Sequence, residues 1–328
     1  MTNRERFIRT LKCEKIGGQV PTFELVFFLT MEAFGRVHMS QRAFWQWDQM
    51  SRTEQTLHIR DIADLYIQIA RRYGHSAIFV DAFGGNLPAF QRLLEEIRTQ
   101  SGDEYFLLAH GDPTWAIPDG DHMTEFSVKM FEAPEELNDE SQRRLDQALE
   151  TAYQLNRAGH LLDGFGLCSD YCFNVNPFFP DDLFGTLIAP YLKAVLDGYR
   201  EMGYYSIKHT DGNIMPILKE IADCGPDAIH SLDPQGGVSL PEARKIVGED
   251  ICLIGNVNCA LLQTGSDEEC DADVLRALRE GMAAGRGYIF STSNCAYTGL
   301  PLARYERMIE LWRQYGNYDT YHTLTTSG

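Results

Sequence analysis

Two hydrophobic patterns alternate along the chain. Short apolar runs rich in β-branched and aromatic residues end in polar residues, and longer segments with apolar positions every three or four residues follow them. Leu192, Val195, Leu196 and Tyr199 show the helical spacing. The short runs predict eight strands, at residues 20–27, 76–83, 105–112, 161–170, 204–212, 228–234, 251–258 and 287–294.

The order of these elements predicts the fold class. Eight strand–helix units without a flexible linker favour one α/β domain over residues 1–328, a (β/α)8 or TIM barrel. A doubly wound open sheet is the alternative, but no GxGxxG motif follows the first strand. Residues 31–74 and 113–140 form long excursions after the first and third strands, where barrel loops shape the pocket.

The composition of the chain limits the classes of molecule that it is expected to bind. Lys and Arg total 29 against 47 Asp and Glu, and a net charge of −18 disfavours nucleic acid and anionic membranes. The first residues lack an apolar signal core, and no apolar run reaches transmembrane length. The eight cysteines lack CxxC spacing, so we expect reduced thiols and a cytoplasmic protein.

The predicted strand ends carry polar groups, and in a barrel these ends form the catalytic face. A carboxylate there can instead cap a loop or helix, and a strand-end histidine is as often a core residue. Glu24 is bracketed by apolar residues and should meet the metal or a cation. The acid–base candidates are Asp81, Asp170, His110 and Glu24, and the substrate-binding candidates are Asn256, Asn258, Asn294 and Tyr171.

A metal site is predicted at the end of the fifth strand. His209 and Asp211 are two residues apart, so they point to one face with Cα atoms about 6.6 Å apart. Cys295, after the eighth strand, would complete three ligands and leave a fourth position open, as catalytic zinc requires. Cys168 and Cys172 are rival thiols. The alternative is that His209 and Asp211 only hydrogen-bond the Gly-Asn turn that follows them.

Several segments resemble one family. They are "MTNRERFIRTLKCEKIGGQVPTFE", "KHTDGNIMPILKEIADCGPDAI", "LIGNVN" and "YIFSTSNCAYTGLPLARYERMIELW". In this order they resemble the uroporphyrinogen decarboxylase superfamily over essentially the whole chain. The resemblance implies a (β/α)8 barrel with its site at the C-terminal mouth.

That superfamily has two branches. The cofactor-free decarboxylases carry an arginine-rich loop after the first strand, where this chain has "FELVFFLTMEAFGR" with the single Arg36. Asp81 matches the position of their catalytic aspartate. The zinc-dependent methyltransferases use a His-x-Cys pair and a distal cysteine. His209 and Cys295 match these, whereas Asp211 replaces the middle cysteine and gives the site a harder, oxygen ligand.

The resemblance therefore implies a zinc-dependent methyltransferase. It would work with a separate corrinoid protein docked at the barrel mouth, on a small substrate such as a methoxylated compound. A metal-independent decarboxylase that uses Asp81 as its acid is the first alternative, and a barrel that binds a small molecule without turning it over is the second. The sequence leaves open whether Glu24 or Asp170 supplies a further metal ligand.

Overall fold

A computed structural model describes residues 1–42 and 44–322; residue 43 and residues 323–328 of the expected domain lie outside the described residues. It is an α/β fold built on a parallel sheet of seven strands in sequential order. The strands are β1 (Ala77–Phe79), β2 (Phe106–His110), β3 (Gly164–Leu167), β4 (Tyr205–Thr210), β5 (Ala228–Ser231), β6 (Cys252–Ile254) and β7 (Tyr288–Ile289).

The first predicted strand, residues 20–27, is not one of these seven. Only isolated bridges form there: Thr22 pairs in parallel with His75, beside β1, and with Phe290, beside β7, and Phe27 pairs in parallel with Ala296. The Thr22 carbonyl accepts from the Ser76 amide at 2.7 Å, and its hydroxyl donates to the Phe290 carbonyl at 2.9 Å. This segment therefore contacts both edges of the curled sheet.

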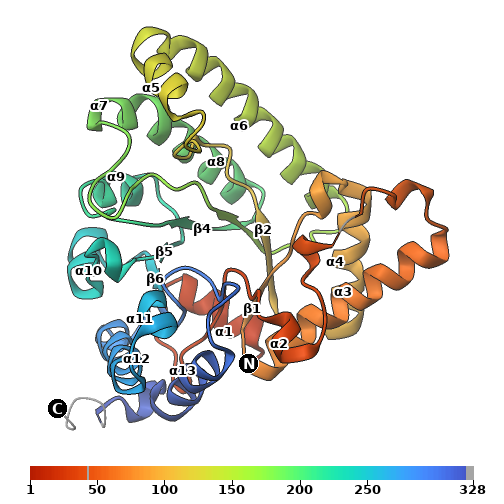
Figure 1. Cartoon of the computed structure of the whole chain (residues 1–328), viewed down its shortest axis with the longest axis vertical. Helices are drawn as coiled ribbons and strands as arrows, with labels where there is room; N and C mark the ends of the chain where they lie inside the picture. The colour runs from red at the N-terminus through yellow and green to blue at the C-terminus, as the bar shows by residue number, and fades with distance from the viewer. Residues whose placement is uncertain (43, 323–328) are drawn as a thin grey trace.

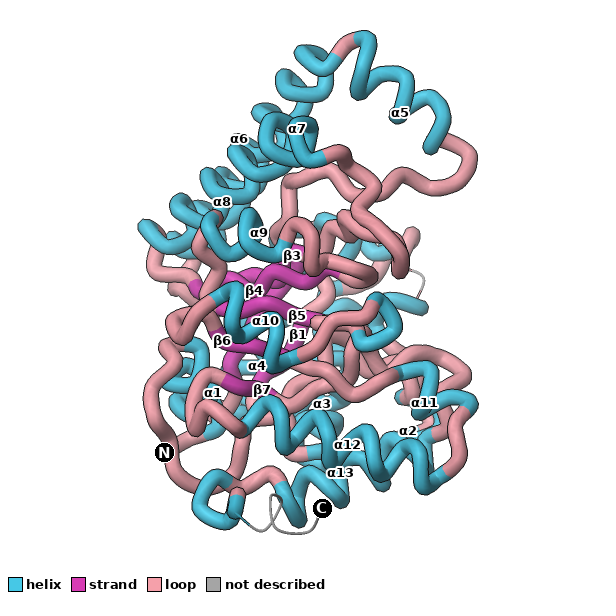
Figure 2. The backbone as a smooth tube through the Cα atoms, turned by 90° about the vertical axis from the view of Figure 1, so that its left-hand side faces the viewer, coloured by secondary structure: helices cyan, strands magenta, loops and turns pink. Residues whose placement is uncertain are grey.

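Helices surround the strands, which gather at the centre of the molecule (Figures 1 and 2). Within the described part of the chain, no helix is both long and apolar enough to cross a membrane. The helices are α1 (Asn3–Leu11), α2 (Thr30–Phe34), α3 (Arg52–Tyr73), α4 (Leu87–Ser101), α5 (Met123–Glu132), α6 (Pro134–Arg157), α7 (Asp181–Leu183), α8 (Ala189–Glu201), α9 (Leu218–Asp223), α10 (Leu240–Val247), α11 (Cys259–Thr264), α12 (Asp267–Met282) and α13 (Leu302–Tyr315).

The two predicted excursions are largely helical. Residues 31–74 contain most of α2, two short 3-10 turns and all of α3. Ser51 and Glu54 form a capping box at the start of α3, and Gly74 ends it in the left-handed conformation. Residues 113–140 contain α5 and the start of α6, which extend away from the sheet at the top of Figure 1.

Side chains alternate between the two faces of each strand, as the strand period requires. Phe106 and Leu108 of β2 and Ile207 of β4 belong to a buried cluster enclosed by the strands. Helix α1 adds Phe7 and Leu11 to this cluster and so closes one end of the enclosure. The outward-facing residues pack against the surrounding helices in two larger clusters.

A buried ion pair lies on the outer face of β4. The Lys208 ammonium is 2.8 Å from an Asp112 carboxylate oxygen, and both side chains are fully buried. Asp112 also accepts hydrogen bonds from Thr114 and from the Ser169 amide, and the ammonium lies 4.0 Å from the centre of the Tyr171 ring. Burial opposes ionisation of Asp112, but Lys208 and these donors hold its pKa at about 2.

Breaking this pair should strongly destabilise the fold. In Asp112→Asn the buried ammonium loses its counter-charge, so we expect the free energy of unfolding to fall by about 3–5 kcal/mol. Urea unfolding followed by tryptophan fluorescence measures the loss. The exposed Asp121→Asn is the matched control and should change stability little. A loss below about 1 kcal/mol in Asp112→Asn would contradict a stabilising role.

Candidate metal centre

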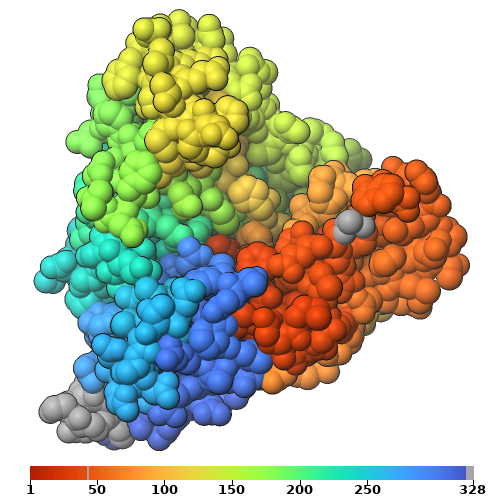
Figure 3. All heavy atoms as spheres, in the orientation of Figure 1, coloured from red at the N-terminus to blue at the C-terminus, as the bar shows by residue number. Residues whose placement is uncertain are grey.

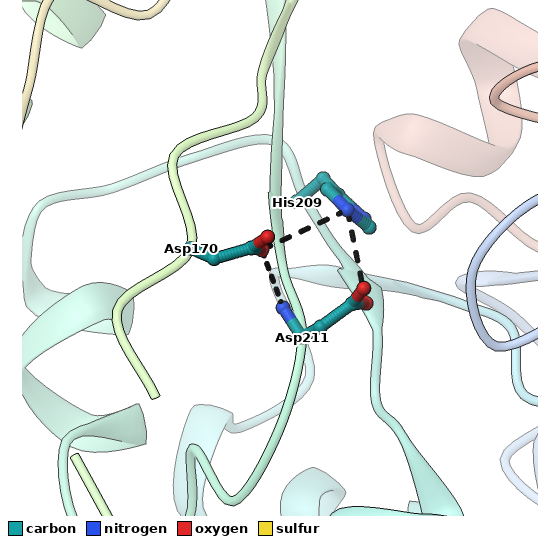
Figure 4. Close-up of side chains that lie close together, drawn as sticks. All are labelled: Asp170, His209 and Asp211. Carbon is teal, nitrogen blue, oxygen red and sulfur yellow. Dashed lines mark hydrogen bonds and ion pairs between the residues drawn. The ribbon is translucent and has the colours of Figure 1, made fainter. Parts of the chain in front are cut away.

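Three side chains converge beyond the end of β4. Asp170 lies in the loop after β3, His209 lies on β4, and Asp211 follows β4 directly. Their candidate ligand atoms all lie within 4.8 Å of one another. The His209 Nε2 atom is 3.7 Å from an Asp211 oxygen and 4.0 Å from an Asp170 oxygen, and the three side chains point toward one another (Figure 4).

Local backbone geometry fixes this arrangement. His209 and Asp211 share the inward face with Ile207, as the strand period predicts. Gly212 has a φ of +80°, and a Cβ there would lie 2.6 Å from the carbonyl oxygens of Cys172 and Phe173. Only glycine fits this turn without strain. This turn lets the loop that carries Asp170 pack against the end of β4, where the Asp211 amide donates a hydrogen bond to Asp170 at 2.9 Å.

The Asp211 carboxylate is oriented by two neighbours. The Ser231 hydroxyl donates to one oxygen at 2.7 Å, and the Asn294 amide donates to the other. Burial raises the pKa of Asp211 to about 7, and the charge of Asp170 contributes to this increase. Among the described residues, neither Asp170 nor Asp211 forms an ion pair with a lysine or arginine.

His209 is held by a second imidazole. Its Nδ1 atom lies 2.8 Å from Nδ1 of His230, and Nε2 of His230 lies 3.2 Å from the Thr292 carbonyl oxygen. Burial lowers the pKa of His209 to about 4 and holds that of His230 well below its usual range. Both rings are therefore neutral near pH 7.

The hydrogen bonds determine which nitrogen of His209 is free. A carbonyl oxygen only accepts, so Nε2 of His230 carries the proton that it donates to Thr292. Nδ1 of neutral His230 is then an acceptor, and Nδ1 of His209 must donate to it. The remaining nitrogen of His209, Nε2, has a lone pair directed at the two carboxylates. Such an arrangement of one nitrogen and two oxygen donors suits a divalent cation.

Cys295 lies outside this cluster. Its carbonyl accepts a long hydrogen bond from the Cys259 thiol at 3.9 Å. Burial raises the pKa of the Cys295 thiol, and the nearby charges of Glu24 and Asp211 add to the effect. The thiol is thus neutral in this environment, and Asp170 takes the third place in the cluster instead. The role of Cys295 as a ligand stays a prediction.

Glu24 lies on the outer side of the curled sheet. Its sequence neighbours Phe23 and Leu25 belong to the enclosed cluster, so Glu24 faces the opposite way, toward α13. There it accepts hydrogen bonds from Thr292, with the hydroxyl at 2.6 Å, and from Tyr305. Instead of a metal or a cation, Glu24 meets hydroxyl groups. Burial raises its pKa to about 8, so it is largely protonated at neutral pH.

The other acid–base candidates are apart from the cluster. Asp81 follows β1, accepts from the Phe83 amide at 3.0 Å and lines a pocket of about 440 Å³. His110 ends β2 and is exposed. Only Asp170 of the four acid–base candidates belongs to the cluster.

Among the substrate-binding candidates, Asn294 alone contacts the cluster. Asn256 is fully buried, donates to the Leu232 carbonyl at 2.7 Å and accepts from Arg276 at 3.1 Å. Asn258 caps the start of α11 through the amides of residues 260 and 261. These contacts brace the curled sheet.

Tyr171 is also fully buried. Its hydroxyl lies 2.6 Å from the Thr114 hydroxyl, and Lys208 lies over its ring. The ring therefore covers the buried ion pair, and contact of Tyr171, Asn256 or Asn258 with substrate stays a prediction.

Sequence reasoning missed His230 and Ser231. His230 pairs with His209 in the register of β4 and β5, which places the two rings side by side. A signal was present in "AIHSLDP", where a histidine interrupts an apolar strand, but its partner is visible only once the strands are aligned.

Parts of this sequence match those of known proteins. Residues 174–315 match the family model of uroporphyrinogen decarboxylase (URO-D). The uroporphyrinogen decarboxylase of Chlorobium luteolum is 29% identical over 100 residues, which span 30% of this chain and 27% of that relative's length. The chain resembles the uroporphyrinogen decarboxylase superfamily. The resemblance expected from the sequence is thus confirmed for this part of the chain.

Solved structures also resemble this chain. A methyltransferase from Methanosarcina mazei superposes with a TM-score of 0.69 at 16% identity, and the match covers 96% of this chain and 99% of that one. At this identity the likeness concerns the fold.

The buried Glu24 predicts a pH-dependent stability. The folded chain binds its proton more tightly than the unfolded chain, because the pKa rises from 4.5 to about 8. The stabilisation is complete below pH 4.5 and is lost as the pH rises through 8. Glu24→Gln stays neutral, so at pH 9 it should be more stable than the wild type by several kcal/mol, at about 1.4 kcal/mol per pH unit between the two pKa values.

Urea unfolding at pH 5 and pH 9 tests this, with the exposed Glu132→Gln as the matched control. The stability difference between Glu24→Gln and wild type should grow with pH, whereas that of the control should stay constant. A difference that is the same at both pH values would show that Glu24 is already ionised in the folded chain at pH 5.

Proposed function

We propose that this protein is a cytoplasmic, zinc-dependent methyltransferase that works with a separate corrinoid protein on a small, oxygen-bearing substrate. The fold similarity to a methyltransferase and the match to the URO-D family support the branch. The two bridges of Thr22 support a closed (β/α)8 barrel, with residues 20–27 as its eighth strand. The corrinoid partner would dock over the mouth, where the cluster lies.

The observation that carries the proposal is the direction of the free His209 lone pair. It points at two carboxylates that have no lysine or arginine partner among the described residues. Without a cation, this arrangement places two carboxyl groups and a lone pair against one another in a partly buried site, and the raised pKa of Asp211 reflects that conflict. A divalent cation bound by Asp170, His209 and Asp211 would remove that conflict.

The donor set indicates the kind of substrate. One imidazole and two carboxylates form a harder site than one that contains thiolates. A zinc ion bound there would supply Lewis acidity toward a substrate oxygen. Ser231 and Asn294 fix the Asp211 carboxylate, and His230 fixes the His209 ring. The Asp170 side chain is 46% exposed against 7% for His209, so substrate would reach the site from the Asp170 side.

The decarboxylase alternative draws support from the family match and from Asp81 at the end of β1. A polyanionic porphyrinogen, however, needs cations that are available to its carboxylates. Arg36 already pairs with Asp61 and Asp64 at 2.6 and 2.7 Å, and Arg42 pairs with Asp61 at 2.5 Å. The guanidinium groups that follow the first strand segment are therefore engaged, which favours the methyltransferase.

Metal content tests the proposal directly. Protein purified without a metal-binding tag should contain about one zinc per chain by inductively coupled plasma mass spectrometry. His209→Ala and Asp211→Ala should lose it, because each removes a ligand held by the barrel wall, and Asp170→Ala should bind it more weakly. Cys295→Ala should retain zinc if the cluster is the complete protein ligand set.

Two outcomes would change this proposal. Absence of metal in the wild type, even after incubation with zinc, would exclude the metal site and make decarboxylation the leading function. Loss of zinc in Cys295→Ala but not in Asp170→Ala would replace Asp170 by Cys295 as the third ligand, as the sequence alone predicts.

The His209–His230 hydrogen bond yields a separate prediction. His230→Leu removes the acceptor that fixes the His209 ring, so zinc affinity should fall about 10–100-fold, as is typical for residues that orient metal ligands. His230→Asn can keep an acceptor oxygen near the former Nδ1 position and should recover part of the affinity. Competition with a chromophoric chelator measures both. Equal zinc affinities in wild type and His230→Leu would contradict an orienting role.

A further inference from the structure

The pocket that Asp81 lines lies at the end of β1, and none of its lining residues belongs to the Asp170–His209–Asp211 cluster. It has a volume of about 440 Å³ and lies between residues 39–42 and 44–48 on one side and the turn that contains Phe83 on the other. Small-molecule sites usually have volumes of about 300–1,000 Å³. The red and orange segments that include this part of the chain form the right-hand flank of the face in Figure 3.

Aromatic rings make up much of the lining. Phe83 packs against Trp47 and Phe44 with ring centres 4.7 and 4.8 Å apart, and Phe44 contacts Trp47 at 5.7 Å. These three rings support one another and so form a fixed wall. Trp45 also lines the pocket but is 78% exposed, which is unusual for the largest apolar side chain.

The charge of the lining is negative. Asp48 and Asp81 both line the pocket, and in the described part of the chain neither has an ion-pair partner within 4 Å. Arg42 is the one cationic side chain of the lining, and its guanidinium is already paired with Asp61 at 2.5 Å. The negative charges of these two carboxylates are thus not neutralised by a neighbouring cation, which disfavours binding of an anionic ligand.

Aromatic faces combined with unpaired carboxylates select one class of ligand. A small inorganic cation would need several oxygen donors at one point, and Asp48 and Asp81 are absent from the candidate metal cluster. A methylated ammonium ion instead spreads its charge over methyl groups, which contact aromatic faces through cation–π attraction while a carboxylate supplies the counter-charge. We propose that this pocket binds a small methylated ammonium compound.

This inference goes beyond the proposed function and does not rest on it, because no residue of the Asp170–His209–Asp211 cluster lines the pocket. Choline carries a methylated ammonium group and is small enough for the pocket, so it serves as the probe.

Isothermal titration calorimetry of the full chain with choline tests the proposal. The titration is done in EDTA, so that its result does not depend on the metal centre, and at constant ionic strength set with sodium chloride. The neutral isostere 3,3-dimethyl-1-butanol is the matched ligand, because it has the same shape without the charge. We expect choline to bind at least about tenfold more tightly, which corresponds to about 1.4 kcal/mol.

Variants locate the site. Asp81→Asn and Trp45→Ala should each weaken choline binding several-fold, while Asp121→Asn and Phe131→Ala, both exposed and outside the pocket lining, should leave it unchanged. Circular dichroism confirms that each variant is folded. Equal affinity for the two isosteres would overturn the proposal in favour of a merely apolar pocket, and absence of choline binding would overturn it outright. Neither result would bear on zinc content, so the two proposals fail separately.

Discussion

The structure depends on the alternation of side chains along parallel strands that curl around a common interior. Residues two apart share a face, and neighbouring residues do not. Over residues 208–211, at the end of β4, this constraint places His209 and Asp211 on the inner face of the sheet and Lys208 on its outer face. The inner face supplies candidate metal ligands, and the outer face supplies a buried ion pair with Asp112. One short segment therefore contributes both to the site and to the anchoring of the strand that bears it.

Desolvation determines the chemical state of the groups around the site. His209 and His230 are kept neutral because burial disfavours the imidazolium form, and the hydrogen bond to Thr292 then leaves one arrangement of the protons. Glu24, on the other side of the wall, is kept protonated by the same effect. The rings of His209 and His230 and the Thr292 carbonyl are thus paired donor to acceptor, and the lone pair left over on His209 faces the carboxylates.

The sequence predicts the strands and their polar ends well, since hydrophobic period is a local property. It predicts that His209 and Asp211 meet for the same reason. It does not reveal that Asp170 joins them, because the path of the loop after β3 is fixed by a contact with the Asp211 amide, 41 residues away. The pairing of His209 with His230 needs the register of β4 and β5. The outward direction of Glu24 depends on a strand segment that forms only isolated bridges.

The three clustered side chains differ in how firmly they are held. His209 and Asp211 are held in place by His230, Ser231 and Asn294, whereas Asp170 sits on a loop with nearly half of its side chain in solvent. Such a set would be hemilabile toward a bound cation: His209 and Asp211 would form a permanent chelate, and Asp170 would be the exchangeable donor. An incoming oxygen could then replace Asp170 without dismantling the site, and the displaced carboxylate would remain nearby to accept a proton from the newcomer.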